Sequence, residues 1–232
     1  MLLGSQQTIH TNANELDIYL GNVKLKQVRS SRYLGIDVDC LLKWDCHVQT
    51  MCRNISGKLA TLSRLRHFMS EEALNKIYRT KIMPCLDYGI TVWANCNDNI
   101  KNLIFRLQKR ATRIVKSNFD YKNVRGLDII NELRWQTIDK RRDYFFSTQM
   151  YKCIQGDAPV WLTNRILMVN ENHDIVTRYA SQKNVVIPRP NLESFRKSFQ
   201  YQGAVVWNGL PSYLKEASSL DIFKKMYKQM YF

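Results

Sequence analysis

The spacing of hydrophobic residues divides the chain into a short region with the two-residue period of β-strands and a longer region with the 3.6-residue period of helices. The first 40 residues form the short region. Residues 17–20 and 23–26 flank Gly21-Asn22, a pair that is typical of a two-residue turn. This pattern predicts a β-hairpin near the N-terminus.

A further strand is predicted over residues 33–39, directly before the change of period, where apolar and polar residues alternate. Leu34, Ile36 and Val38 fall on one face of this strand, and Asp37 and Asp39 fall on the other. Acidic residues two positions apart on a strand can bind one Mg²⁺ or Mn²⁺ ion together. They are also common on solvated strand faces, so the pair is either a metal site or an ordinary polar face.

Helical spacing predicts a series of helices after residue 41. Ser70, Ser219 and Asp45 are candidate N-caps, because a side-chain oxygen at that position can accept a hydrogen bond from an amide of the first turn. Pro84 is expected to interrupt the helix that follows Ser70. The predicted helical ranges are 45–67, 71–83, 100–116, 127–133, 136–154 and 219–230.

The order of these elements predicts an α+β fold that is mainly α. A small N-terminal antiparallel β region over residues 1–40 is followed by a helical bundle over 41–118 and by a helical C-terminal extension over 119–232. Glycine and proline are scarce and 45% of the residues are hydrophobic, which excludes collagen-like and disordered chains. No apolar run is long enough to span a membrane, and the N-terminus lacks the features of a signal peptide. An intracellular protein, nuclear or cytoplasmic and not secreted, is therefore expected.

Positive charge is concentrated in the helical part of the chain. The formal net charge is +15, and residues 41–118 contain 14 basic and 5 acidic residues. An excess of this kind attracts polyanions, of which nucleic acid is the commonest inside cells. The alternative is a basic protein surface with no polyanionic partner.

The sharpest charged feature lies between residues 100 and 116, where no acidic residue occurs. Arg106, Lys109, Arg110 and Arg113 share one face of the predicted helix. Such a face fits contact with the phosphates of a nucleic acid. It could instead be a solvated face that is paired with acids from other helices.

Other chemistry has little support in the sequence. A Gly-rich phosphate loop, a G-x-S-x-G motif, an HExxH motif and a C-x-x-C pair are all absent, so we expect neither a cofactor nor a metal. The six cysteines are expected to be buried or free thiols, since nothing indicates secretion. The five tryptophans could stack on bases, but core packing is the favoured interpretation for Trp44, Trp93, Trp135, Trp161 and Trp207.

Short blocks of residues follow one another along nearly the whole chain. They are Tyr33-Leu34-Gly35-Ile36, Asp39, Leu42, Trp44, His47, Ile77-Tyr78, Pro84-x-Leu86-x-Tyr88-Gly89, Val92-Trp93, Leu107-Gln108-Lys109-Arg110-Ala111-x-Arg113-Ile114, Glu132-Leu133-x-Trp135, Arg141, Thr177-Arg178, Ser198-Phe199, Trp207-Asn208-x-Leu210-Pro211 and Phe223-Lys224. No single block is specific, but the ordered set resembles the part that follows the catalytic palm in LINE-type (non-LTR) retrotransposon reverse transcriptases of the jockey-like branch.

The resemblance implies a fragment of an RNA-directed DNA polymerase. It would comprise the last palm strand, a hairpin similar to the primer grip at Tyr33, Leu34 and Gly35, a thumb over 41–118 and a helical C-terminal extension. Catalysis in that family needs three carboxylates that hold two metal ions, two of them in an Asp-Asp motif. No Asp-Asp pair occurs in this chain, so by itself it is not expected to be an enzyme. The β region, next to the missing palm, is expected to be less stable than the helices.

The resemblance also implies sequence-independent binding of an RNA or DNA template–primer through its backbone. Arg106, Lys109, Arg110 and Arg113 would carry this binding. The supporting basic residues would be Arg64, Arg66, Lys140, Arg141 and Arg142.

Three alternatives remain. One is a helical protein-interaction module derived from a retrotransposon. Another is a metal-dependent transferase that uses Asp37 and Asp39, and the last is a translated remnant without function. Neither a membrane nor a small-molecule substrate is indicated.

Overall fold

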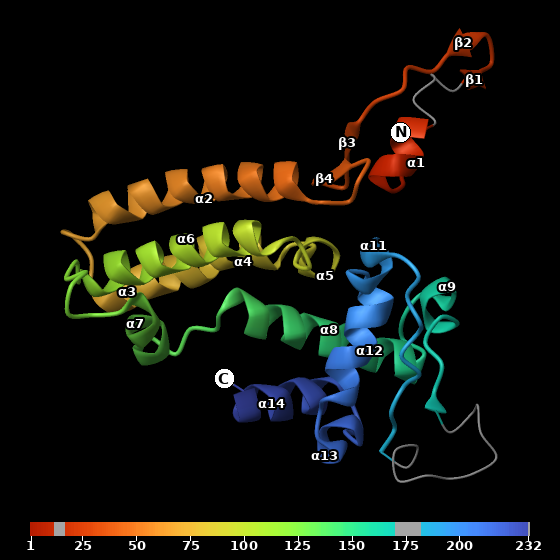
Figure 1. Cartoon of the computed structure of the whole chain (residues 1–232). Helices are drawn as coiled ribbons and strands as arrows, with labels where there is room; N and C mark the ends of the chain where they lie inside the picture. Colours follow the sequence, from red (N-terminus) through yellow and green to blue (C-terminus); the bar gives the residue numbers. More distant parts are fainter. Residues whose placement is uncertain (12–16, 170–181, 232) are drawn as a thin grey trace.

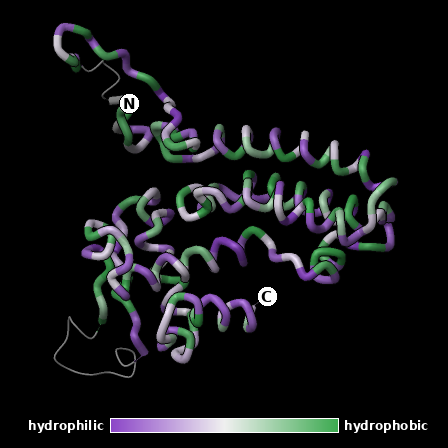
Figure 2. Tube along the Cα trace, turned by 180° about the vertical axis from the view of Figure 1, so that it is seen from behind, coloured by the Kyte–Doolittle hydropathy of each residue, from purple (hydrophilic) through white to green (hydrophobic). Residues whose placement is uncertain are grey.

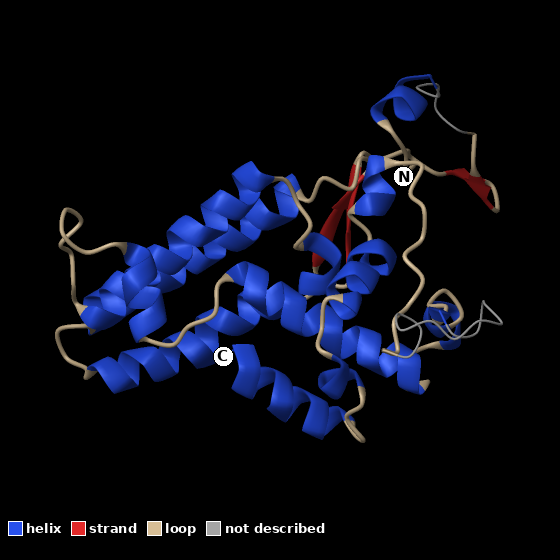
Figure 3. Ribbon diagram, turned by 60° about the horizontal axis from the view of Figure 1, so that its bottom comes forward, coloured by secondary structure: helices blue, strands red, loops and turns tan. Residues whose placement is uncertain are grey.

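The computed structural model describes residues 1–11, 17–169 and 182–231 and has the predicted α+β, mainly α composition (Figure 1). The strands lie near the N-terminus, and the rest of the described chain consists of helices and the loops that connect them (Figure 3). The N-terminal elements are α1 (Gln6–Thr11), β1 (Tyr19–Leu20), β2 (Val23–Lys24), β3 (Ser30–Tyr33) and β4 (Ile36–Asp39). The block Thr177-Arg178 lies outside the described residues.

The β region consists of two antiparallel hairpins. Strands β1 and β2 pair through Leu20 and Val23 on either side of the Gly21-Asn22 turn, which confirms the first predicted hairpin. The prediction of one strand across residues 33–39 is wrong, because the chain turns there and β4 pairs back onto β3.

Leu34 and Gly35 form the turn between β3 and β4, with φ angles of 46° and 80°. Such left-handed angles suit glycine and are uncommon for leucine. Strict alternation of apolar and polar residues therefore concealed a turn, since only one of its two residues is a typical turn former.

The helices of the first half form a layered bundle in which α2 packs on α6 and α6 packs on α7 (Figure 1). They are α2 (Asp45–Leu65), α3 (Glu71–Ile77), the π-helical segment η1 (Tyr78–Ile82), α4 (Met83–Asp87), α5 (Ile90–Trp93), α6 (Asp98–Lys116) and α7 (Gly126–Glu132). The turns of the long helices contain both hydrophobic and hydrophilic residues, as expected of amphipathic helices (Figure 2). The interior of this bundle is a first hydrophobic cluster that extends from Val48 to Ile138.

The second half is built around α8 and α12, which pack against each other. Its elements are α8 (Ile138–Gln155), α9 (Val160–Thr163), α11 (Glu193–Arg196), α12 (Phe199–Asn208), α13 (Ser212–Lys215) and α14 (Leu220–Tyr231). A second hydrophobic cluster extends from Met150 to Tyr227. The core therefore divides within α8, and the predicted boundary after residue 118 does not coincide with this division.

Two of the three predicted N-cap residues are correct. The hydroxyl oxygens of Ser70 and Ser219 accept hydrogen bonds from backbone amides three residues ahead. Asp45, in contrast, is already the first residue of α2. The residue before it, Trp44, has a φ of 66° and supplies no side-chain cap.

Pro84 does not end its helix. It lies in the first turn of α4, where the missing N–H of a proline costs no hydrogen bond within the helix. The π-helical turn η1 directly precedes α4. The chain from α3 to α4 is therefore nearly continuous, and the interruption is a local change of helical pitch.

The β3–β4 hairpin is attached to the bundle at the turn between α4 and α5. The hydroxyl of Tyr88 donates a hydrogen bond to the carbonyl oxygen of Leu34. Gly89 has a φ of 63°, and a Cβ atom there would lie 2.5 Å from Cδ1 of Ile36. Glycine is favoured at this position by its left-handed backbone angle, and any side chain there would also displace the end of Ile36.

The six cysteines are all free thiols, as expected. Cys46 is exposed, whereas Cys52, Cys96 and Cys153 are buried. Burial raises the pKa of Cys52 and of Cys96 to about 11 and also raises the pKa of Cys153. Within the described ranges, the helices are too short or too polar to cross a membrane.

Candidate nucleic-acid interface

The polar face of α6 presents basic side chains to solvent. Asn97 caps this helix by accepting a hydrogen bond from the amide of Ile100, and an apolar face packs on α2 and α7. Arg106 and Arg110 are exposed. Among the ion pairs of the described residues, none involves either of these two arginines or Lys109.

Lys109 is half-buried between α6 and the start of α7. Its ammonium lies 4.6 Å from the centre of the Phe105 ring. Its aliphatic stem fills the space beside Gly126, where a Cβ atom would approach the stem to 2.8 Å. The side chain thus covers apolar surface with its stem and keeps its charge near the polar face.

Arg113 differs from its three predicted partners, because it is only 5% exposed. Its guanidinium donates hydrogen bonds to the carbonyl oxygens of Asp120 at 3.0 Å and Val124 at 2.7 Å, and more weakly to that of Asn118. It also lies 4.2 Å from the centre of the Tyr121 ring. These contacts use the donors that a phosphate would need, so the structure removes Arg113 from the candidate interface.

The loop that follows α6 is ordered by the interactions of its own polar side chains. The carboxylate of Asp120 accepts hydrogen bonds from the amides of Lys122 and Asn123 and from the Asn123 side chain. These bonds, first of all that from the Asn123 amide, lower the pKa of Asp120. The loop between residues 118 and 125 is therefore held both by this turn and by Arg113.

A pocket of about 590 Å³ opens between the polar face of α6, this loop and α7. We call it the basic pocket. Its lining contains five basic residues and no carboxylate, and Tyr121 and Leu127 add exposed apolar surface. The lining residues are Arg106, Lys109, Arg110, Arg113, Tyr121, Val124, Arg125, Gly126 and Leu127.

Arg125 and Tyr121 were missed by the sequence analysis. Both stand in a polar loop whose sequence has no helical spacing, so nothing indicated that they would lie beside α6. The available signal was their position between two predicted helices, because a short connection places its residues next to the end of the preceding helix.

The supporting residues of α2 lie at the same end of the bundle. Arg64 is exposed in the last turn of the helix. Arg66 lies 4.4 Å from the centre of the Phe119 ring and donates a hydrogen bond to Nε2 of His67. The loop that borders the basic pocket therefore contacts a second arginine, which directly follows α2.

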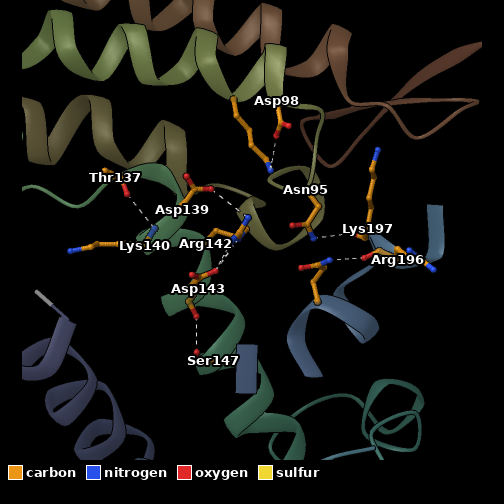
Figure 4. Close-up of polar contacts among 12 residues, drawn as sticks. Asn95, Asp98, Thr137, Asp139, Lys140, Arg142, Asp143, Ser147, Arg196 and Lys197 are labelled. Atoms are coloured by element: carbon orange, nitrogen blue, oxygen red, sulfur yellow. Dashed lines mark hydrogen bonds and ion pairs between the residues drawn. The ribbon is translucent and has the colours of Figure 1, made fainter. Parts of the chain in front are cut away.

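The basic cluster at the start of α8 is mostly engaged in internal ion pairs. Arg141 makes a two-pronged contact with the carboxylate of Asp87, with Nε and Oδ1 2.6 Å apart. Arg142 pairs with Asp139 and Asp143 (Figure 4). Arg141 therefore anchors α8 to α4, whereas both partners of Arg142 lie in α8 itself. Contrary to the prediction, neither guanidinium is available to phosphates.

Lys140 is the exception in this cluster. It is exposed on the first turn of α8, and its side chain extends away from Arg142 (Figure 4). No ion pair of the described residues involves it, so its charge remains accessible. Lys140 stays a candidate contact.

The residues predicted to resemble a primer grip lie at the tip of the β3–β4 hairpin. Tyr33 and Leu34 are 70% and 73% exposed, and Gly35 lies next to the ring of Tyr88. The exposed ring of Tyr33 and the exposed side chain of Leu34 leave apolar surface open to solvent at this turn. The interactions of the described residues do not link this tip to the basic pocket.

The acidic pair at Asp37 and Asp39 is engaged in local structure. The carboxylate of Asp39 accepts hydrogen bonds from the amides of Leu41, Lys43 and Trp44, which orders the entry into α2. Asp37 lies within 4.0 Å of both Arg32 and His47. No cluster of three acidic, histidine or cysteine side chains suited to a metal ion occurs in the described part of the chain.

Most of the tryptophans belong to the hydrophobic core, as the sequence analysis predicted. Trp93, Trp135 and Trp207 are buried, and Trp135 stacks on Tyr78 with ring centres 3.6 Å apart. Trp44 packs partly buried against the first cluster. Trp161 is the one for which this expectation was wrong, since it is 66% exposed on α9.

Comparisons with protein-family models, with curated proteins and with solved structures found no match to this chain.

Proposed function

We propose that the chain binds the phosphate backbone of a nucleic acid through the basic pocket and the adjoining face of α6. The observation that carries the proposal is the accessibility of Arg106 and Arg110 on a surface without a carboxylate. Basic side chains that have no protein partner are the ones that can release counterions from a phosphate backbone. Arg125 extends this surface across the pocket.

We further propose that the chain is a non-catalytic relative of the thumb and C-terminal extension of LINE-type reverse transcriptases. The support is the ordered set of sequence blocks together with the absence of an Asp-Asp motif in this chain. In this proposal the ligand is an RNA or DNA template–primer that is bound without sequence preference. Binding replaces catalysis as the function of the chain, and the supporting contacts come from Arg64 and Lys140.

The experiment is a fluorescence titration of a labelled primer–template at several salt concentrations. We expect binding that weakens steeply with salt. Neutralising two side chains in Arg106→Gln/Arg110→Gln should reduce the slope of log affinity against log salt by about 1.4–1.8, since each lost phosphate contact contributes about 0.7–0.9. Affinity should fall to a similar extent for unrelated sequences.

The matched control is Arg189→Gln/Lys225→Gln, which removes the same charge from exposed positions in the second half of the chain. It should leave the salt slope unchanged. Binding that is insensitive to salt, or an equal loss in the control variant, would contradict the proposal. In that case the protein-interaction module becomes the better explanation of the basic surface.

A further inference from the structure

The basic pocket contains an aromatic ring as well as positive charge. Tyr121 is 70% exposed although the guanidinium of Arg113 lies over one of its faces at 4.2 Å. Its opposite face must therefore be open to solvent. A backbone-binding surface needs only charge, so this ring requires a separate explanation.

The ring lies on a guanidinium and in a turn that are both held in place before any ligand binds. Arg113 is anchored by the carbonyl oxygens of Asp120 and Val124, which stand on either side of Tyr121 in the loop. The Asp120 carboxylate closes the turn through the amides of Lys122 and Asn123. A pre-ordered aromatic ring loses little conformational freedom when a ligand binds to it.

The positive charges stand around this ring. Arg106, Arg110 and Arg125 line the same pocket, and its volume of about 590 Å³ is in the range of sites that hold small molecules. A planar base stacked on Tyr121, with Arg113 beneath the ring, would gain both stacking and cation–π stabilisation. The flanking arginines would then contact the phosphates on either side of that base.

We infer that the basic pocket holds one unpaired nucleotide of a single-stranded segment, with its base on Tyr121 and its phosphates at Arg106, Arg110 and Arg125. The inference rests on the proposed function and specifies its ligand. Bases of a duplex are already stacked on their neighbours, so a duplex can use the arginines but not the ring. RNA and DNA both supply the required base and phosphates.

The test compares a single-stranded oligonucleotide of mixed sequence with a duplex of equal length, both labelled, against the full chain. Tyr121→Ala should weaken single-strand binding by about 5- to 150-fold, the loss that one stacked base produces, and leave duplex binding unchanged. Tyr121→Phe keeps the ring and should bind as the unmodified chain does. Trp161→Ala removes an equally exposed aromatic from α9 and should have no effect on either probe.

A single strand that contains 2-aminopurine supplies a direct readout of stacking. Its fluorescence should be quenched by the unmodified chain and by Tyr121→Phe, but not by Tyr121→Ala at saturation. Equal losses for single strand and duplex in Tyr121→Ala, or an unchanged single-strand affinity, would overturn the inference while leaving the proposed function intact. Absence of binding to both probes by the unmodified chain would overturn the proposed function itself, and the inference with it.

Discussion

Arg113 shows how a charged residue on a basic helix face can have a structural role. Its neighbours Arg106 and Arg110 project into solvent, whereas its guanidinium turns back to the loop that follows α6. Its hydrogen bonds to the backbone carbonyls of Asp120 and Val124 fix the path of a loop whose side chains are mostly exposed. One residue therefore connects the end of a helix, a loop and the ring of Tyr121.

We predict that Arg113→Met lowers the free energy of unfolding by about 1–3 kcal/mol, because it removes the buried guanidinium that donates to three carbonyl oxygens of the loop. Urea denaturation followed by circular dichroism measures this change. Arg110→Met is the matched control on the same face, and its effect should stay within about 0.5 kcal/mol, since its side chain is exposed. Similar losses in both variants would contradict the structural role of Arg113.

Sequence alone identified the helix and its basic face but could not separate these roles. Helical spacing places Arg106, Lys109, Arg110 and Arg113 together because it reports only the angle at which a side chain leaves the helix axis. Whether a long side chain continues outwards or folds back depends on the loop after the helix. That loop has no periodic pattern from which its path could be predicted.

At the scale of elements, the β3–β4 hairpin is held to the helices by few buried contacts. None of the buried hydrophobic residues of either cluster comes from the first 40 residues. The hairpin is attached at the α4–α5 turn by the Tyr88 hydrogen bond and by the close packing of Ile36 on Gly89. Few buried contacts favour local opening.

We predict that the amides of Ser30–Asp39 exchange with solvent faster than those of α2 and α6, and faster still in Gly89→Ala. The added Cβ atom would collide with Ile36 and would strain a backbone angle that favours glycine. Hydrogen exchange followed by mass spectrometry measures both effects. Slower exchange in the hairpin than in the helices would contradict the prediction.

The control for this variant is Gly57→Ala. Gly57 lies in α2, and a Cβ atom there would meet no other atom within 4 Å. Removing a helical glycine should raise the free energy of unfolding by about 0.5–1 kcal/mol, which is the opposite of the effect expected at Gly89.

Long periodic helices were predicted well, whereas several shorter helices of the second half were not. The positions of α2, α6 and α8 follow from apolar residues that recur over four or more turns. Helix α12 was missed because its apolar residues are interrupted by Gly203, which the structure uses to pack closely on Met150. Helices α9, α11 and α13 have four residues each, too few for a period to be recognised.

At the scale of the whole molecule, two hydrophobic clusters share one helix. Helix α8 contributes Ile138 to the first cluster and Met150 and Tyr151 to the second. The contact of Arg141 with Asp87 ties the start of α8 to α4. The two halves are thus joined by a continuous helix rather than by a flexible linker.

We predict that Trp207→Ala destabilises the second cluster by about 3–5 kcal/mol, because it leaves a cavity among buried aromatic rings. Amide exchange should accelerate in α12 and α14 and change little in α2 and α6. Trp161→Ala is the control, since that ring is exposed. Equal acceleration in all four helices would show that the two clusters unfold as one unit.

The distribution of free thiols gives this chain a built-in set of chemical reporters. Alkylating reagents react with thiolates, and a thiol with a pKa of about 11 is ionised in only about one molecule in ten thousand at neutral pH. A reagent should therefore modify exposed Cys46 within the native state and reach Cys52 and Cys96 only when the first cluster opens. Cys153, in α8 beside the second cluster, reports in the same way on the other half. The order in which the thiols are alkylated is consequently a record of which half of the molecule opens first.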